Sequence, residues 1–290
     1  MTKQLAGLIV LFLLGKITEG QPVTGKLQFE KGKTLNIQME MKSSVTQQAM
    51  NQAIDFTADA AVVHFYKVLN ADAGNTTLHH EIKKIGFNFD GMGQKRSFDS
   101  DKTQDMQGPL GDPVKNILSK KFEMVIDPYG KALAIKPEKT DSIQTDERLA
   151  IVFTMLKDIT DVVYPPNKGE PSFFKILPAT EIIKGESWVD SLQNANGKFS
   201  TSYTVTDITD SLIVVDFKGK SNTVNKAMMM GRETITTLNS EHIGKIILDR
   251  TTGIIKQKNI ITESGGTTEA MGGTVPVTSK TTITIYVKPE

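Results

Sequence analysis

Residues 35–42, LNIQMEMK, alternate between apolar and polar side chains along their whole length. The apolar side chains stand at odd positions and the polar ones at even positions, so an extended chain carries them on opposite faces. This period of two predicts a β-strand with one dry and one solvated face. The stretch therefore favours an antiparallel sheet that buries one of its faces.

The same alternation recurs toward the end of the chain, in FSTSYTV at residues 199–205 and TITIYV at residues 282–287. Of the 32 threonines, 18 lie in the final 92 positions, and threonine favours a half-solvated pleat. Further strands are predicted at 58–69, 78–89, 121–127, 131–136, 211–218, 233–239, 243–249 and 253–262. The fold class is therefore mainly β.

Two segments have a helical pattern instead. Asp112 and Pro113 form an N-cap and N1 pair for a short helix over about 113–119. Residues 146–163 predict one long helix, which Thr145 can cap. Its apolar stripe consists of Leu149, Val152, Phe153, Leu156, Ile159 and Val163. A helix with a single apolar stripe needs an apolar partner, so we expect it on the concave face of a curved sheet.

Three motifs recur in the same order before and after a linker at 164–172. The Lys-Gly motif at 31–35 matches 184–188, Tyr66-Lys67-Val68 matches Tyr203-Thr204-Val205, and the Asp-turn-Gly hairpin at 124–130 matches 246–253. This order predicts two related β-units, 21–163 and 173–290, within one structural domain. The alignment places Trp188 at the position of Leu35, so we expect the tryptophan to be buried.

Residues 1–20 have the pattern of a removable signal peptide. Lys3 precedes ten mostly apolar residues, 5–14, and small residues at Thr18 and Gly20 fit a cut before Gln21. Ten residues are too few to span a bilayer, which takes about 20. An uncleaved anchor is the alternative. We expect an exported protein, periplasmic or extracellular, with no transmembrane segment after the leader is removed.

Composition excludes several classes of partner and chemistry. Without residues 1–20 the chain carries equal numbers of basic and acidic side chains, which gives no electrostatic reason to bind nucleic acid. It contains no cysteine, which excludes disulfides, thiolate nucleophiles and thiolate metal sites.

Catalytic and metal motifs are lacking. His79 and Glu81 share one face of a strand and His80 points the other way, but a zinc site needs a third ligand from elsewhere. Asp99, Asp101 and the nearby Asp105 lie in a polar segment without the glycine and final glutamate of a calcium loop. We expect no catalytic residues, no metal and no cofactor.

Methionine is concentrated in three short stretches, 49–52, 227–231 and 270–273. We interpret them as hairpin tips or nearby bends. Thioether side chains adapt to irregular shapes, so these residues either fill the core or form a soft rim for a ligand or partner. The candidate rim residues are Met50, Met228, Met229, Met230 and Met271.

The leader, the Lys-Gly-x-Thr strand at 31–34, the hairpin at 126–130, the Phe174–Trp188 stretch and the Gly272–Pro276 segment together resemble a family. It is an uncharacterised domain family of exported Bacteroidetes envelope proteins, in which no catalytic residues are established. A looser similarity in fold is to the half-open β-barrel of periplasmic lipoprotein carriers. That similarity implies a curved antiparallel sheet around helices, with an apolar cavity.

Three functions follow from these patterns. The first is a non-catalytic exported envelope protein that binds an apolar ligand, such as a lipid, in a β-sheet concavity. The alternative is a structural or protein-interaction module that contacts another envelope protein. A hydrolase with dispersed carboxylates is the least favoured.

Overall fold

The computed structural model describes residues 22–49, 52–72, 74–91, 93–137, 159, 163, 165–194, 197–229, 232–270 and 273–290. The strands are β1 (Thr34–Ala49), β2 (Gln52–Ala71), β3 (Thr76–Gly91), β4 (Gln94–Asp99), β5 (Phe122–Ile126), β6 (Ala132–Pro137), β7 (Ser187–Asn194), β8 (Gly197–Ile208), β9 (Leu212–Met229), β10 (Arg232–Asp249), β11 (Ile255–Ala270) and β12 (Gly273–Pro289). Several exceed the predicted lengths because polar residues continue the extended chain beyond each apolar run.

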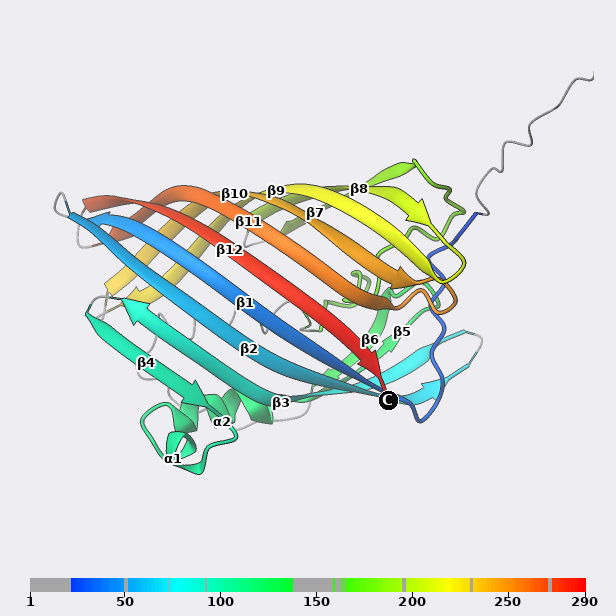
Figure 1. Cartoon of the computed structure of the whole chain (residues 1–290), viewed down its shortest axis with the longest axis horizontal. Coiled ribbons are helices and arrows are strands. Elements are labelled where there is room, and N and C mark those ends of the chain that lie inside the picture. The colour runs from blue at the N-terminus through cyan, green and yellow to red at the C-terminus, as the bar shows by residue number, and fades with distance from the viewer. Residues whose placement is uncertain are drawn as a thin grey trace, which may run out of the picture.

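The twelve strands form one antiparallel sheet in the order β6-β5-β3-β2-β1-β12-β11-β10-β9-β8-β7, with β4 paired to β3. The sheet curves so that β1–β3 and β9–β10 form opposite walls and β11–β12 connect them (Figure 1). It does not close, since β6 and β7 end the order on either side. The predicted curved antiparallel sheet is confirmed.

The apolar core lies on the concave face. Ile37, Met39 and Met41 of β1 are buried, and the neighbouring strands add Val62 and Ile285 to the same face. At the end of the sheet that holds Glu290, the concavity is filled by two irregular segments, 22–33 and 172–182. Hydrogen bonds join them, such as Gly25 N–H to the Pro178 carbonyl. Their side chains Leu27 and Phe174 belong to the core.

Two short helices lie beside β3 and β4 (Figure 1): α1 (Thr103–Met106) and α2 (Gly111–Ser119). The short helix predicted over 113–119 is therefore present. The predicted cap was wrong: the helix begins at Gly111, and the Asp112 carboxylate accepts a hydrogen bond from Lys115 Nζ. The long helix predicted at 146–163 lies outside the described residues except for Ile159 and Val163. Both of these are buried in the core, and a long helix is not confirmed.

The repeated Lys-Gly motifs have the same local structure. Gly32 and Gly185 both have positive φ, at 86° and 92°, a conformation that glycine adopts without strain. Each glycine N–H donates to the matching valine carbonyl, Val68 in one half and Val205 in the other. Leu35 pairs with Tyr66 in β2, and Trp188 pairs with Tyr203 in β8. The division into two related units stays a prediction.

Trp188 was expected to be buried, and it is half-buried and packs against the core. It stacks on Tyr203 with ring centroids 5.1 Å apart. β7 is the last strand in the sheet order and has β8 as its described neighbour. One side of Trp188 therefore lacks the neighbouring strand that Leu35 has in β12.

Candidate functional site

The concave face changes character along the strands. Toward the Glu290 end it is apolar, whereas toward the hairpins that follow β1, β9 and β11 it carries hydroxyl groups. We call the following side chains the hydroxyl patch: Ser43, Ser221, Ser240, His242, Thr262, Ser264 and Thr281. The expected separation of a dry and a wet face is therefore wrong for this half of the sheet, because serine and threonine face inward here.

The hydroxyl patch is held together by hydrogen bonds between strands. Ser240 and Ser264 lie 2.7 Å apart, and Ser43 and Thr281 lie 2.9 Å apart, between hydroxyl oxygens. Thr236 and Thr268 form a similar pair nearby at 3.0 Å. In each pair, one hydroxyl is the hydrogen-bond partner of the other, so these bonds form without a bridging water.

His242 bridges three strands in the patch. Its Nε2 lies 2.9 Å from Ser221 Oγ, and its Nδ1 lies 2.9 Å from Thr262 Oγ1. Burial lowers the pKa of His242, so the ring is neutral at pH 7 and donates at one nitrogen while accepting at the other. In a catalytic triad of serine, histidine and aspartate, the carboxylate stabilises the imidazolium. Here Thr262 takes the place of the carboxylate, and a threonine carries no charge that could do so.

Lys258 lies on the concave face of β11, next to the hydroxyl patch. Its partners across the strands are Ile246 of β10 and Ile285 of β12, both buried. Its Nζ lies 5.5 Å from the centroid of the Phe217 ring. Burial lowers the pKa of Lys258 to about 8. Sequence reasoning placed a strand here but missed the inward lysine.

The apolar half of the concavity holds a histidine pair. His64 Nδ1 and His80 Nε2 lie 3.0 Å apart, and the side chains are 0% and 2% exposed. The second ring nitrogens, His64 Nε2 and His80 Nδ1, have no hydrogen-bond partner in the described structure. Burial lowers the pKa of both rings, that of His80 to about 3. His80 points away from the face of His79 and Glu81, as predicted, and its partner is a core histidine.

Metal ligands do not converge within the described ranges, where no group of three or more His, Cys, Asp or Glu side chains can hold an ion. The three aspartates at 99–105 have local roles. Lys84 pairs with Asp99 and Asp101, and Asp105 Oδ2 accepts from the backbone N–H of Asp99. This polar segment contains the end of β4 and all of α1, and these contacts join its two parts.

Carboxylates with shifted pKa values all shift downward among the residues that the structure describes. They are Asp72, Glu81, Asp99, Asp207, Glu241 and Asp249. A general acid in a hydrolase needs a raised pKa, and a catalytic pair needs two pKa values moved apart. None of these six carboxylates therefore has the raised pKa that a general acid needs.

Of the predicted rim residues, Met50, Met230 and Met271 lie outside the described residues, and Met228 and Met229 are described as backbone alone. The strand ends that flank them are described. Ala49 pairs with Gln52, Met229 with Arg232 and Ala270 with Gly273. All three pairs lie at the same end of the sheet, because β2, β1, β12, β11, β10 and β9 are successive antiparallel neighbours.

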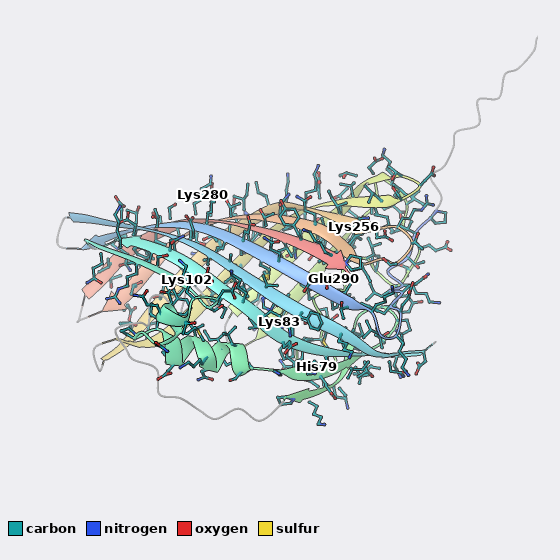
Figure 2. The ribbon with its side chains drawn as sticks, turned by 60° about the horizontal axis from the view of Figure 1, so that its bottom comes forward. His79, Lys83, Lys102, Lys256, Lys280 and Glu290 are labelled. Carbon is teal, nitrogen blue, oxygen red and sulfur yellow. The ribbon has the colours of Figure 1, made fainter. Side chains whose placement is uncertain are left out.

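The convex face is charged. Ion pairs cross neighbouring strands there, such as Lys280 with Glu263 and Lys220 with Glu241, both with 2.7 Å between nitrogen and oxygen. Lys280 projects outward from the sheet in Figure 2. A depression of about 400 Å³ adjoins Lys220 and Glu241, lined mainly by side chains that alternate toward this face. Most of its lining residues are lysine, glutamate, serine and asparagine, so it is not the apolar cavity predicted for the concave face.

The sequence model of a family of unknown function, DUF6263, matches residues 73–140 and 171–255, more than half of the chain. The matched ranges include the hairpin at 126–130 and the Phe174–Trp188 stretch. They leave out the Lys-Gly strand at 31–34 and the Gly272–Pro276 segment. The predicted resemblance to an uncharacterised family is thereby confirmed. None of the curated proteins matches the sequence.

Several solved structures are distantly similar. One is a structure of lipovitellin that concerns lipid–protein interactions, with 10% sequence identity and a TM-score of 0.46. The match covers 90% of this chain but only 26% of the lipovitellin chain. The NalP autotransporter translocator domain from Neisseria meningitidis has 9% identity and a TM-score of 0.31, covering 90% of each chain. An outer membrane channel from Pseudomonas putida F1 has 7% identity and a TM-score of 0.27, covering 91% of this chain and 98% of the channel. Because all three TM-scores are below 0.5, none of these proteins indicates what this chain binds.

In the described segments, the helices are too short or too polar to cross a membrane.

Proposed function

The chain belongs to a family of unknown function, DUF6263, and we propose from its own geometry that it binds an apolar ligand, such as a lipid, in the concavity of its sheet. In this proposal it is a non-catalytic, exported protein of the cell envelope. The placement in the envelope rests on the signal-peptide pattern of residues 1–20.

One observation carries the proposal: the concave face keeps apolar side chains partly exposed in its hairpin half. Val45, Leu238 and Ile260 face inward there and are partly buried, whereas Ile37 and Ile285 at the filled end are fully buried. A ligand that covered these side chains would remove apolar surface from water at about 25 cal/mol per Å². The paired hydroxyls of the patch tolerate such a ligand, because contact with it breaks none of their hydrogen bonds.

Lipid analysis tests the proposal. We expect protein purified from its native envelope to release an acyl lipid on organic extraction, in an amount comparable to the protein. The variant Ile260→Gln, which places a polar group on the concave face, should release several-fold less. The matched control is Ile243→Gln, because Ile243 is on the neighbouring strand, faces outward and is 51% exposed. Mass spectrometry of the extracts measures both, and equal lipid content in the two variants would count against the concavity as the site.

We propose further that Met50, Met228, Met229, Met230 and Met271 form an adaptable rim at the hairpin end of this concavity. The shared position of the flanking strand ends supports the proposal. Thioethers exposed at a rim oxidise readily, whereas a core thioether is protected. Under mild peroxide we expect these methionines to oxidise faster than Met124, which is 1% exposed, and more slowly once ligand is bound. Peptide mapping measures the oxidation rate of each methionine. If the five methionines oxidised as slowly as Met124, they would not form an exposed rim.

The second candidate is an interaction module, and the sheet edge favours it. Val189 and Leu192 of β7 are 62% and 41% exposed, and they lie on an edge strand that offers backbone groups for pairing. If extraction yields no lipid while Val189→Lys abolishes recovery of an envelope partner by cross-linking, this candidate replaces the first.

A further inference from the structure

Lys258 is a charged group inside an apolar surface. Its side chain projects from the concave face between Ile246 and Ile285, which are buried on either side. No carboxylate lies within ion-pair distance of its ammonium among the residues that the structure describes. The Lys258 side chain is half-buried, and an ammonium that is partly withdrawn from water is normally paired with a counter-charge.

The ammonium rests on a ring that the fold makes room for. Phe217 extends its ring across Gly244 toward β11, where Lys258 Nζ lies 5.5 Å from the centroid. A Cβ atom at Gly244 would come within 2.5 Å of the ring, so the glycine permits this placement. A cation–π contact stabilises the ammonium but leaves its charge uncompensated.

Several lysines on the convex side of the same strands are paired with acids. Lys220 contacts Glu241, Lys245 contacts Asp216 and Lys280 contacts Glu263. On the same strand as Lys258, Lys256 lies 3.5 Å from an Asp249 oxygen. What distinguishes Lys258 is its setting, because its cross-strand neighbours on the concave face, Ile246 and Ile285, are buried and apolar.

We propose that Lys258 is the counter-charge for the carboxylate of an amphipathic ligand, a long-chain fatty acid, bound in the concavity. The inference rests on the proposed function and names the ligand class of that same site. One ammonium among neutral side chains neutralises one negative charge. A phosphate monoester carries close to two negative charges at pH 7 and would leave one of them unpaired in an apolar surface.

Affinity should depend on pH through Lys258. The groups that face it are Ile246 and Gly244 of β10, Ile285 of β12 and Phe217 of β9, and none of them titrates. The titratable side chains farther along this face are His242 of β10, Tyr203 of β8 and Asp190 of β7. Tyr203 lies 6.0 Å from Phe217 between ring centroids, and Asp190 pairs with Thr201 beside it. Because the carboxylate binds the protonated amine, and burial lowers the pKa of Lys258 to about 8, carboxylate affinity should fall as pH rises above 8.

The test compares two ligands that share an alkyl chain, dodecanoate and dodecanol, on delipidated full-length protein by isothermal titration calorimetry. We expect Lys258→Met to weaken dodecanoate binding roughly ten- to hundredfold, the contribution of a hydrogen bond to a charged group. Dodecanol affinity should be unchanged or higher. Lys256→Met is the matched control, since it removes a convex lysine from the same strand (Figure 2), and both affinities should equal those of the parent.

The outcomes separate the two proposals. If neither ligand binds the parent protein, the proposed function fails and the ligand class fails with it. If both bind the parent with equal affinity, or if Lys258→Met keeps the preference for dodecanoate, the carboxylate assignment is overturned while apolar binding stands. The assignment is supported if Lys258→Met removes the preference for dodecanoate over dodecanol and Lys256→Met keeps it. Loss of this preference in the parent protein above pH 8 supports the assignment independently.

Discussion

Replacement of both His64 and His80 by glutamine is expected to flatten the pH dependence of stability between pH 6.5 and pH 5. Burial lowers the pKa of each ring, that of His80 to about 3, so the folded protein keeps both rings neutral in this range. The unfolded chain binds protons below about pH 6.5. It therefore gains protons on unfolding, and stability falls as pH falls.

The size of this effect follows from linkage. Between pH 6.5 and pH 5, each histidine that stays neutral in the folded state lowers the free energy of unfolding by about 1.5 kcal/mol, so the pair lowers it by about 3 kcal/mol. Carboxylates generally take up protons below this pH range, so their contribution to the pH dependence of stability is separate from that of the histidines. Urea denaturation at a series of pH values measures the difference between parent and double variant.

His79→Gln is the matched control, because it removes the neighbouring histidine, which faces the other side of β3 (Figure 2). It should reproduce the parent's pH dependence. A double variant that lost stability as steeply as the parent between pH 6.5 and pH 5 would show that the pair is not held neutral.

The two histidines show how far the sequence predicts this core. The alternation in 58–69 puts His64 on the same face as Val62 and Tyr66, and the alternation in 78–89 puts His80 on the face of Leu78. Their contact depends on register, and β2 and β3 shift register between Val63 and His64. A bulge moves every later pairing by one residue. No residue pattern in this chain predicts the position of this bulge.

Lys258 was missed for the same physical reason. The pairing of β10 with β11 shifts between Ile247 and Leu248, so the inward face of β11 changes phase close to its start. Ile260 and Ile261 are both apolar, and alternation alone does not decide which one faces inward. The register with β12, where Lys258 lies beside Ile285, settles it. Within the hydroxyl patch, Thr262 and Thr281 belong to the threonine-rich end of the chain. The threonine content suggested a half-solvated face there, whereas these two side chains face inward.

The local motifs were predictable because they depend on neighbours in sequence. Asp127 and Asp249 accept hydrogen bonds from backbone N–H groups of their own turns, and Gly130 and Gly253 have positive φ at 80° and 70°. Such turns need no information about distant strands.

Phe174→Ala is expected to lower the free energy of unfolding by about 3–5 kcal/mol, the usual cost of removing a buried aromatic ring. Phe174 is 0% exposed and contacts three other rings, those of Phe29, Phe173 and Tyr66, each with centroids 5.3 Å apart. Tyr66 in turn donates a hydrogen bond to the Val163 carbonyl. The ring therefore ties the irregular segment 172–182 to β2 and to the N-terminal segment.

The matched control is Phe173→Ala, the same substitution one residue earlier, because Phe173 is only partly buried. Its cost should be clearly smaller, since its site stays open to solvent and leaves no closed cavity. Chemical denaturation of both variants at pH 7 measures the two costs. If Phe174→Ala unfolded with the parent's midpoint, or if the two variants lost equal stability, segment 172–182 would not fill the Glu290 end of the concavity. The ligand would then have the whole concave face available instead of its hairpin half.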